Sequence, residues 1–129
     1  MKVCIDTNAY RHFLENNTAV LKLLEQAEAV FIPTVVLGEL FAGFRMGRRF
    51  EYNCNVLNDF LSEDNVSIVD VTYDSAQRYG EIVAQLKNKG TPIPTNDIWV
   101  AATAFETGSR LITYDAHFKQ VPGLLLLSP

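Results

Sequence analysis

Val3-Cys4-Ile5-Asp6-Thr7-Asn8, near the start of the chain, passes from an apolar run to polar side chains. A short apolar run of this kind predicts a buried strand, which we place at Lys2–Ile5. The polar residues that follow favour a helix start, and we expect a helix at Asn8–Glu15. A strand that leads directly into a helix is typical of α/β proteins, in which helical crossovers join parallel strands.

The rest of the chain repeats this alternation of short apolar runs and longer helical patterns. No linker or internal repeat divides it, and its length suits one domain over residues 1–129. We therefore predict a three-layer α/β/α sandwich with a central, mainly parallel sheet of about five strands. Further strands are expected at Ala29–Ile32, Val66–Val69, Arg110–Thr113 and Leu124–Leu127. Further helices are expected at Thr18–Ala27, from a Thr34 cap to about Met46, around Phe50, Cys54, Leu57 and Leu61, and at Asp74–Lys87 and Asn96–Thr107.

Apolar residues at helical spacing also predict the inward faces of two helices. Gly90 and Gly108 lie just beyond two expected helix ends, where glycine is favoured because it adopts left-handed backbone angles. The inward-facing residues expected are Val20, Leu24 and Ala27 on one helix, and Ala76, Tyr79, Val83 and Leu86 on another.

The composition narrows the classes of function. The chain has 15 Asp and Glu against 11 Lys and Arg, which argues against a protein that binds nucleic acid by electrostatics alone. Cys4 and Cys54 lack zinc-type spacing and predict two buried free thiols in a reducing compartment. No charged-then-apolar leader and no membrane-length apolar run occur, so we expect a soluble cytoplasmic protein.

Three aspartates are predicted to meet at one edge of the sheet. Asp6 and Asp115 each follow directly after an expected strand, and Asp97 opens the apolar helix that ends near Thr107. Each aspartate alone is equally well explained as a helix-start residue. Parallel sheets form their sites outside the carboxyl ends of the strands, and we therefore expect these carboxylates to converge there.

Glu39 is the least easily explained of the acidic residues. It is the only charged residue between Val35 and Phe44, and its helical neighbours are Val, Ala and Gly. A carboxylate there must reach solvent or find a partner, because burying it alone is costly. A solvated helix face is the alternative, with Val35, Ala42 and Gly43 at the margin of the packed stripe.

Together, Asp6, Glu39, Asp97 and Asp115 predict a metal site. Carboxylates that share a pocket raise each other's pKa, and such a cluster makes physical sense around a hard cation. Mg²⁺ and Mn²⁺ prefer oxygen ligands, and they can orient a phosphodiester and activate a water for attack. Without these four residues the acidic and basic residues are equal in number, so the acidic balance does not exclude a nucleic-acid substrate.

Four ordered motifs cover essentially the whole chain. They are Val3-Cys4-Ile5-Asp6-Thr7-Asn8, Val36-Leu37-Gly38-Glu39-Leu40, Pro94-Thr95-Asn96-Asp97-Ile98-Trp99-Val100-Ala101-Ala102-Thr103-Ala104 and Leu111-Ile112-Thr113-Tyr114-Asp115-Ala116-His117-Phe118, followed by the tail Val121-Pro122-Gly123-Leu124. These motifs resemble those of PIN-domain ribonucleases. The size, with no added domain, is most similar to the VapC-type toxins of type II toxin–antitoxin systems.

This resemblance implies an Mg²⁺- or Mn²⁺-dependent endoribonuclease, a cognate VapB-type antitoxin and usually a homodimer. Asp6 and Asp97 would be the main metal ligands. Glu39 and Asp115 would complete the acidic pocket, through water or a second metal. The reaction expected is hydrolysis of an RNA phosphodiester bond by a metal-activated water, in line with the departing oxygen.

The same resemblance assigns supporting polar roles to Thr7, Asn8 and Thr113, the last through a hydrogen bond near the fourth acidic residue. His12 and His117 are the only histidines, and the mechanism needs neither as a general base. We expect a structural role for His117, with substrate contact as the alternative.

The densest basic cluster consists of Arg45, Arg48 and Arg49. These arginines could meet RNA phosphates, solvate a turn between two helices, or hold acidic residues of an antitoxin. A hydrophobic groove for an antitoxin helix could form nearby, although core packing more often explains such residues. The groove residues would be Phe41, Phe44 and Met46.

Other functions stay open on the sequence. A PIN-like nuclease of RNA processing and a non-catalytic binding module are both alternatives to a toxin. A metal-dependent cleavage assay would distinguish a nuclease from the binding module. A phosphatase with Asp6 as nucleophile would need a second aspartate at Asn8, and a dinucleotide-binding domain would need a glycine-rich turn after the first strand. Transfer, ribosomal and messenger RNA all remain candidate substrates.

Overall fold

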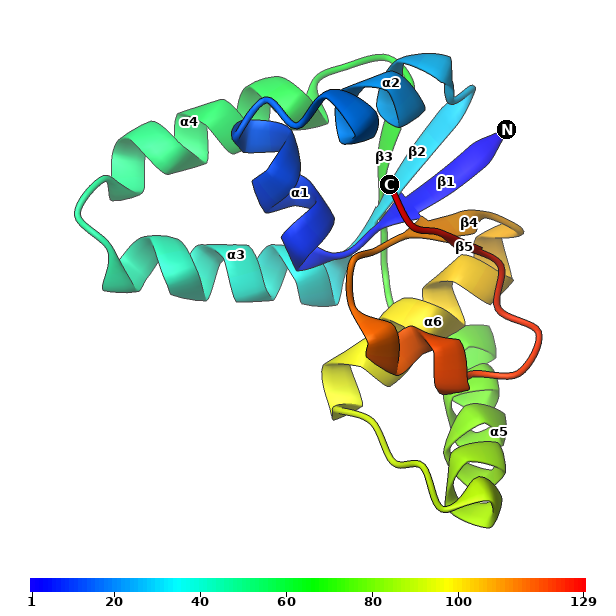
Figure 1. Cartoon of the computed structure of the whole chain (residues 1–129). Coiled ribbons are helices and arrows are strands. Elements are labelled where there is room, and N and C mark those ends of the chain that lie inside the picture. The colour runs from blue at the N-terminus through cyan, green and yellow to red at the C-terminus, as the bar shows by residue number, and fades with distance from the viewer.

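The computed structural model describes all 129 residues and contains one five-stranded parallel sheet with the order β3-β2-β1-β4-β5 (Figure 1). The strands are β1 (Lys2–Ile5), β2 (Ala29–Pro33), β3 (Val66–Val69), β4 (Arg110–Ile112) and β5 (Leu126–Leu127). The helices are α1 (Thr7–Leu14), α2 (Thr18–Gln26), α3 (Thr34–Met46), α4 (Phe50–Leu61), α5 (Tyr73–Lys89), α6 (Thr95–Thr107) and the 3-10 helix η1 (Ala116–Gln120).

The strand order reverses next to β1. From β1 the chain passes outward to β2 and β3, and it then returns through α5 and α6 to β4 on the other side of β1. Because crossovers are right-handed, the helix pairs before and after this reversal cover opposite faces of the sheet, and Figure 1 shows α5 and α6 apart from α1 to α4. The predicted α/β/α fold is confirmed, and the carboxyl ends of β1 and β4 flank the switch point where such sheets bind ligands.

The helix α6 packs directly on the sheet. It contacts β1, β2 and β4, and its residues Val100–Ala104 are all buried. The small alanine side chains of this stretch allow a close approach between helix and strands, as is usual where small residues lie at an interface. This packing places the first turn of α6, which contains Asp97, beside the carboxyl end of β1.

The predicted inward face of α5 is partly wrong. Ala76 and Val83 are exposed, while Ser75, Ile82 and Leu86 are buried and Tyr79 is half-buried. The helix is covered on one side only, by α6, where the Tyr79 ring stacks on Trp99 with ring centroids 4.1 Å apart. With α5 packed in this way, Ile82 is buried and Val83 is exposed.

Some predicted element ends also differ from the structure. Thr34 is the first residue of α3 rather than its cap, because Pro33 occupies the cap position without a side-chain hydrogen bond. The last two strands are shorter than predicted, since Thr113 and Leu124 lie outside the ladder. The prediction for the other helix face is confirmed, with Val20, Leu24 and Ala27 buried. The left-handed glycines Gly90 and Gly108 are confirmed as well.

Both cysteines are free thiols, as predicted, but only Cys4 is fully buried and Cys54 is partly exposed. Burial raises the pKa of the Cys4 thiol well above its usual range, so this thiol is not a reactive nucleophile. No helix of the structure has both the length and the apolar character that crossing a lipid bilayer requires.

Candidate active site

Asp6 lies at the junction of β1 and α1. Its Oδ1 accepts a hydrogen bond from the backbone N–H of Ala9 at 2.8 Å, which caps α1, and its Oδ2 accepts one from the Thr113 hydroxyl at 2.5 Å. The residue is only 6% exposed. The carboxylate is therefore a helix cap and a pocket residue at once, and the two explanations raised by the sequence do not exclude each other.

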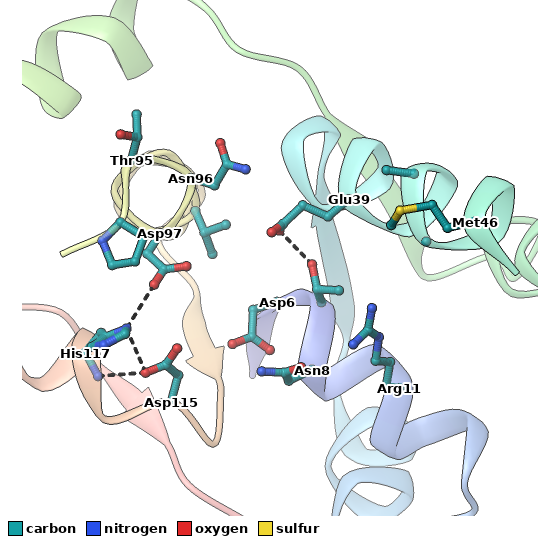
Figure 2. Close-up of a pocket in the computed structure, with 15 residues that line it drawn as sticks. Asp6, Asn8, Arg11, Glu39, Met46, Thr95, Asn96, Asp97, Asp115 and His117 are labelled. Carbon is teal, nitrogen blue, oxygen red and sulfur yellow. Dashed lines mark hydrogen bonds and ion pairs between the residues drawn. The ribbon is translucent and has the colours of Figure 1, made fainter.

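Glu39 projects from α3 toward the same space (Figure 2). Its Oε1 accepts a hydrogen bond from the Thr7 hydroxyl at 2.8 Å, and the residue is half-buried. The only acidic residue of α3 thus has a polar partner on α1. The bond also joins the first and second motifs across 32 positions of sequence.

Asp97 and Asp115 meet at His117. The Nδ1 atom of His117 lies 3.4 Å from Asp97 Oδ2 and 3.1 Å from Asp115 Oδ1. Asp115 also caps η1, as predicted, because its Oδ1 accepts a hydrogen bond from the backbone N–H of His117 at 2.9 Å. The Thr113 hydroxyl oxygen accepts a hydrogen bond from the Asp115 N–H at 2.9 Å, so one threonine contacts both Asp6 and Asp115.

All four carboxylates line one open pocket of about 660 Å³ (Figure 2). The pocket lies where α1, α3, α6 and η1 approach one another, outside the carboxyl ends of β1 and β4. Its remaining walls are formed by Thr7, Asn8 and Arg11 of α1, Ala42, Gly43 and Met46 of α3, Pro94, Thr95, Asn96 and Val100 at the start of α6, and His117.

The electrostatics of the pocket disfavour negative charge. Burial raises the pKa of Asp6, and the charges of Asp115 and Glu39 raise it further, against the lowering effect of the hydrogen bonds from Thr113 and Ala9. Burial likewise raises the pKa of Asp97, helped by the carboxylate of Asp115 and opposed by His117. Ionised carboxylates held this close repel one another unless a cation joins them.

The donor set fits a divalent cation. No lysine or arginine forms an ion pair with Asp6, Glu39, Asp97 or Asp115, and only His117 approaches two of them. Oxygen-rich pockets of this kind suit hard cations such as Mg²⁺. The carboxylates thus have the chemistry of a cation site and lack lysine or arginine partners.

Sequence reasoning did not single out Arg11. Its guanidinium lies over Gly43 of α3, where a Cβ atom would come within 3.6 Å of Nη2, and it forms no ion pair. The available signal was its position one helical turn after Thr7 and Asn8 on a helix that Asp6 caps. His117 was noticed, but its contact with two carboxylates could be recognised only once α6 and η1 were placed together.

The basic cluster lies apart from the carboxylates, around the turn from α3 to α4. The guanidinium of Arg45 stacks over Phe50 and that of Arg49 over Tyr52, each 3.8 Å from the ring centroid. All three arginines, including Arg48, are exposed. Among the apolar neighbours, Phe44 is a core residue, Phe41 is exposed, and Met46 is 83% exposed at the margin of the acidic pocket.

Comparison with known proteins relates these motifs to one family. The family model described as PIN domain matches residues 3–124. Ribonuclease VapC2 of Rickettsia felis is 33% identical over 107 residues, which are 82% of this chain and 78% of that protein. The tRNA(fMet)-specific endonuclease VapC of Salmonella typhimurium is 26% identical over 127 residues, covering 96% of this chain and 95% of that protein.

Solved structures agree with this relationship. VapBC2 from Rickettsia felis, bound to a promoter DNA fragment, matches with a TM-score of 0.86 and 29% identity over 98% of both chains. DNA-bound VapBC from Salmonella typhimurium matches with a TM-score of 0.86 and 25% identity over 98% of this chain and 97% of that chain.

Proposed function

The chain belongs to the PIN-domain family and, within it, to the VapC ribonucleases, and from this premise we propose that it is the endoribonuclease toxin of a toxin–antitoxin pair. It hydrolyses phosphodiester bonds within RNA. The observation that carries the proposal is the pocket in which Asp6, Glu39, Asp97 and Asp115 converge without lysine or arginine partners.

The proposed cofactor is Mg²⁺ or Mn²⁺. When bound, such a cation orients the scissile phosphodiester, lowers the pKa of a water and stabilises charge on the leaving oxygen. Asp6 and Asp97 are the proposed main ligands, because burial raises the pKa of both carboxyls and a cation relieves that unfavourable charge. Glu39 on α3 and Asp115 at the start of η1 complete the acidic pocket.

Polar residues around the carboxylates hold them in place. Thr7 donates a hydrogen bond to Glu39 Oε1 and Thr113 donates one to Asp6 Oδ2, and each bond helps to fix the orientation of its carboxylate. These threonines act as positioning residues. Their hydroxyls also stay anchored when the carboxylates bind a cation, because a carboxylate oxygen accepts more than one contact.

Arg11 and Asn8 form the substrate side of α1. Arg11 is the only arginine that lines the pocket. Its guanidinium forms no ion pair that would have to break before it binds a phosphate. We assign it to a phosphate next to the scissile one, with Asn8 as a neutral hydrogen-bonding group beside it. Arg45, Arg48 and Arg49 extend positive charge beyond the pocket, toward more distant RNA or an antitoxin.

A VapB-type antitoxin is the proposed protein partner, since the matching structures are VapBC complexes. The proposal includes a homodimer of single nuclease domains, each spanning residues 1–129. It also places the protein in the cytoplasm, where RNA is abundant and where the free thiols of Cys4 and Cys54 stay reduced.

A cleavage assay tests the function. The purified chain is stripped with EDTA, incubated with total RNA, and then supplied with Mg²⁺ or Mn²⁺. We expect internal cleavage only after metal is restored. We also expect a small open reading frame next to this gene to encode an antitoxin, and the purified product of that frame to inhibit cleavage. Cleavage that persists in EDTA would contradict the metal role, and full activity in the presence of that gene product would contradict the toxin–antitoxin assignment.

A further inference from the structure

We propose that His117 is itself a metal ligand, and that Asp97, Asp115 and His117 form a mixed nitrogen and oxygen group that binds a transition-metal dication in preference to Mg²⁺. This assignment rests on the proposed function, because it assumes that the pocket binds a metal ion, but its test does not require RNA cleavage. Four carboxylates alone would favour a hard cation, whereas an imidazole nitrogen changes the selectivity of the site.

The distances from the His117 nitrogen to the two carboxylates are close to those between adjacent ligands around one ion. The Nδ1 atom of His117 lies 3.1 Å from Asp115 Oδ1 and 3.4 Å from Asp97 Oδ2, and one donor atom from each residue lies within 4.8 Å of the other two. Two neighbouring ligands at about 2.1 Å from an octahedral ion are about 3 Å apart. The group needs little rearrangement to enclose an ion.

The segment that presents His117 is held in place from two sides. Phe118, the next residue, is 1% exposed and anchors η1 in the core. Asp115 is fixed by its backbone hydrogen bond to Thr113 and by the N–H of His117, which donates to its Oδ1. Because the backbone on both sides of His117 is constrained, the half-exposed imidazole reaches the pocket without freezing a mobile loop.

The imidazole adds a ligand that the four carboxylates do not provide. Nitrogen ligands bind first-row transition ions more tightly than they bind Mg²⁺. Mg²⁺ prefers oxygen ligands and retains several of its waters. The other explanation is an ion pair, in which protonated His117 neutralises Asp97 and Asp115 and binds no metal. The two explanations differ in one observable, a bond between the metal and nitrogen.

Pulsed electron paramagnetic resonance of the Mn²⁺-loaded protein detects that bond directly. We expect nitrogen hyperfine coupling to bound Mn²⁺ in the wild type and its loss in His117→Gln. His12→Gln is the matched control, because His12 lies on α1, packs against the ring of Tyr114 and does not line the pocket. This variant should keep the nitrogen signal. Circular dichroism of each variant confirms that the fold is intact.

Competition between the two cations gives a second readout. We expect His117→Gln to weaken Mn²⁺ binding about tenfold while Mg²⁺ binding changes much less. Bound Mn²⁺ without nitrogen coupling in the wild type, or equal losses of Mn²⁺ and Mg²⁺ affinity in His117→Gln, would overturn the inference. RNA cleavage combined with either result would leave the proposed function standing, whereas nitrogen coupling without RNA cleavage would refute only the function.

Discussion

The hydroxyl of Thr113 donates a 2.5 Å hydrogen bond to Asp6 from 107 positions further along the chain. The same hydroxyl oxygen accepts the backbone N–H of Asp115. Because β1 and β4 are neighbours in the sheet, the residues that follow these strands lie side by side at the switch point. One buried threonine therefore fixes the relative positions of the first and fourth acidic residues.

Replacing Thr113 by valine should weaken metal binding more than it weakens the fold. The shape is nearly retained, but Asp6 loses the bond that orients its Oδ2, and loss of such a partner lowers metal affinity about tenfold. Isothermal titration with Mn²⁺ measures the effect. Thr113→Ser keeps the hydroxyl and should bind metal like the wild type. Equal affinities for the valine variant and the wild type would show that the bond does not position Asp6.

Replacing Arg11 by glutamine should raise KM about tenfold and leave kcat within about threefold, because the lost contact is to a phosphate outside the bond that breaks. Initial rates on a defined RNA oligonucleotide give both constants. Arg110→Gln is the matched control, since Arg110 is exposed at the amino end of β4 and does not line the pocket. A change confined to kcat would place Arg11 at the reacting phosphate instead.

The metal-free protein should be destabilised by its own acidic pocket. The pKa of Asp97 is raised in the fold above the ordinary value of 3.8, so the folded state binds more protons than the unfolded chain. This residue's contribution to stability is therefore most favourable below that ordinary value, and it is lost as the pH rises through the raised pKa.

Asp97→Asn removes this contribution. In EDTA, the melting temperature of the variant should rise relative to that of the wild type as the pH increases from about 4 to 8. Added Mn²⁺ should raise the melting temperature of the wild type far more than that of the variant. Differential scanning calorimetry at several pH values follows both trends. A variant that is less stable than the metal-free wild type at pH 8 would refute the electrostatic account.

The inward face of α5 can be tested by a pair of alanine substitutions. Ile82 is 1% exposed and Val83 is 36% exposed. Ile82→Ala should reduce the free energy of unfolding by about 2–4 kcal/mol through loss of buried contacts, whereas Val83→Ala should change it by less than about 0.5 kcal/mol. Urea unfolding measures both. The reverse order of effects would support the face predicted from spacing.

The sequence was sufficient to predict the fold and the convergence of the four acidic residues. Asp6 and Asp115 directly follow strands, and parallel topology brings the carboxyl ends of strands to one edge. The orientation of α5 was not predictable, because Val83 and Ile82 are both apolar and only the packing of α5 against α6, which includes the Tyr79–Trp99 stack, shows which of them is buried. Local spacing contains no information about that tertiary contact.

Other features of the pocket also depend on tertiary placement. The sequence shows that His117 follows Asp115 by two residues, but not that α6 brings Asp97 to within 3.4 Å of it. Arg11 could be placed near the site by helical spacing alone, yet its freedom from ion pairs becomes visible only in the three-dimensional structure. The sequence therefore predicts where the acidic residues gather, and the structure adds the groups that face them.

Single-turnover RNA cleavage by Asp97→Asn, with Mn²⁺ and Mg²⁺ each at saturation, shows whether the acidic pocket carries out the reaction. Asp59→Asn, an exposed change on α4, is the matched control. We expect the control to cleave like the wild type and Asp97→Asn to be slower by at least about 100-fold, because the variant would no longer hold the cation against the phosphodiester. Cleavage by folded Asp97→Asn at the wild-type rate would contradict this expectation.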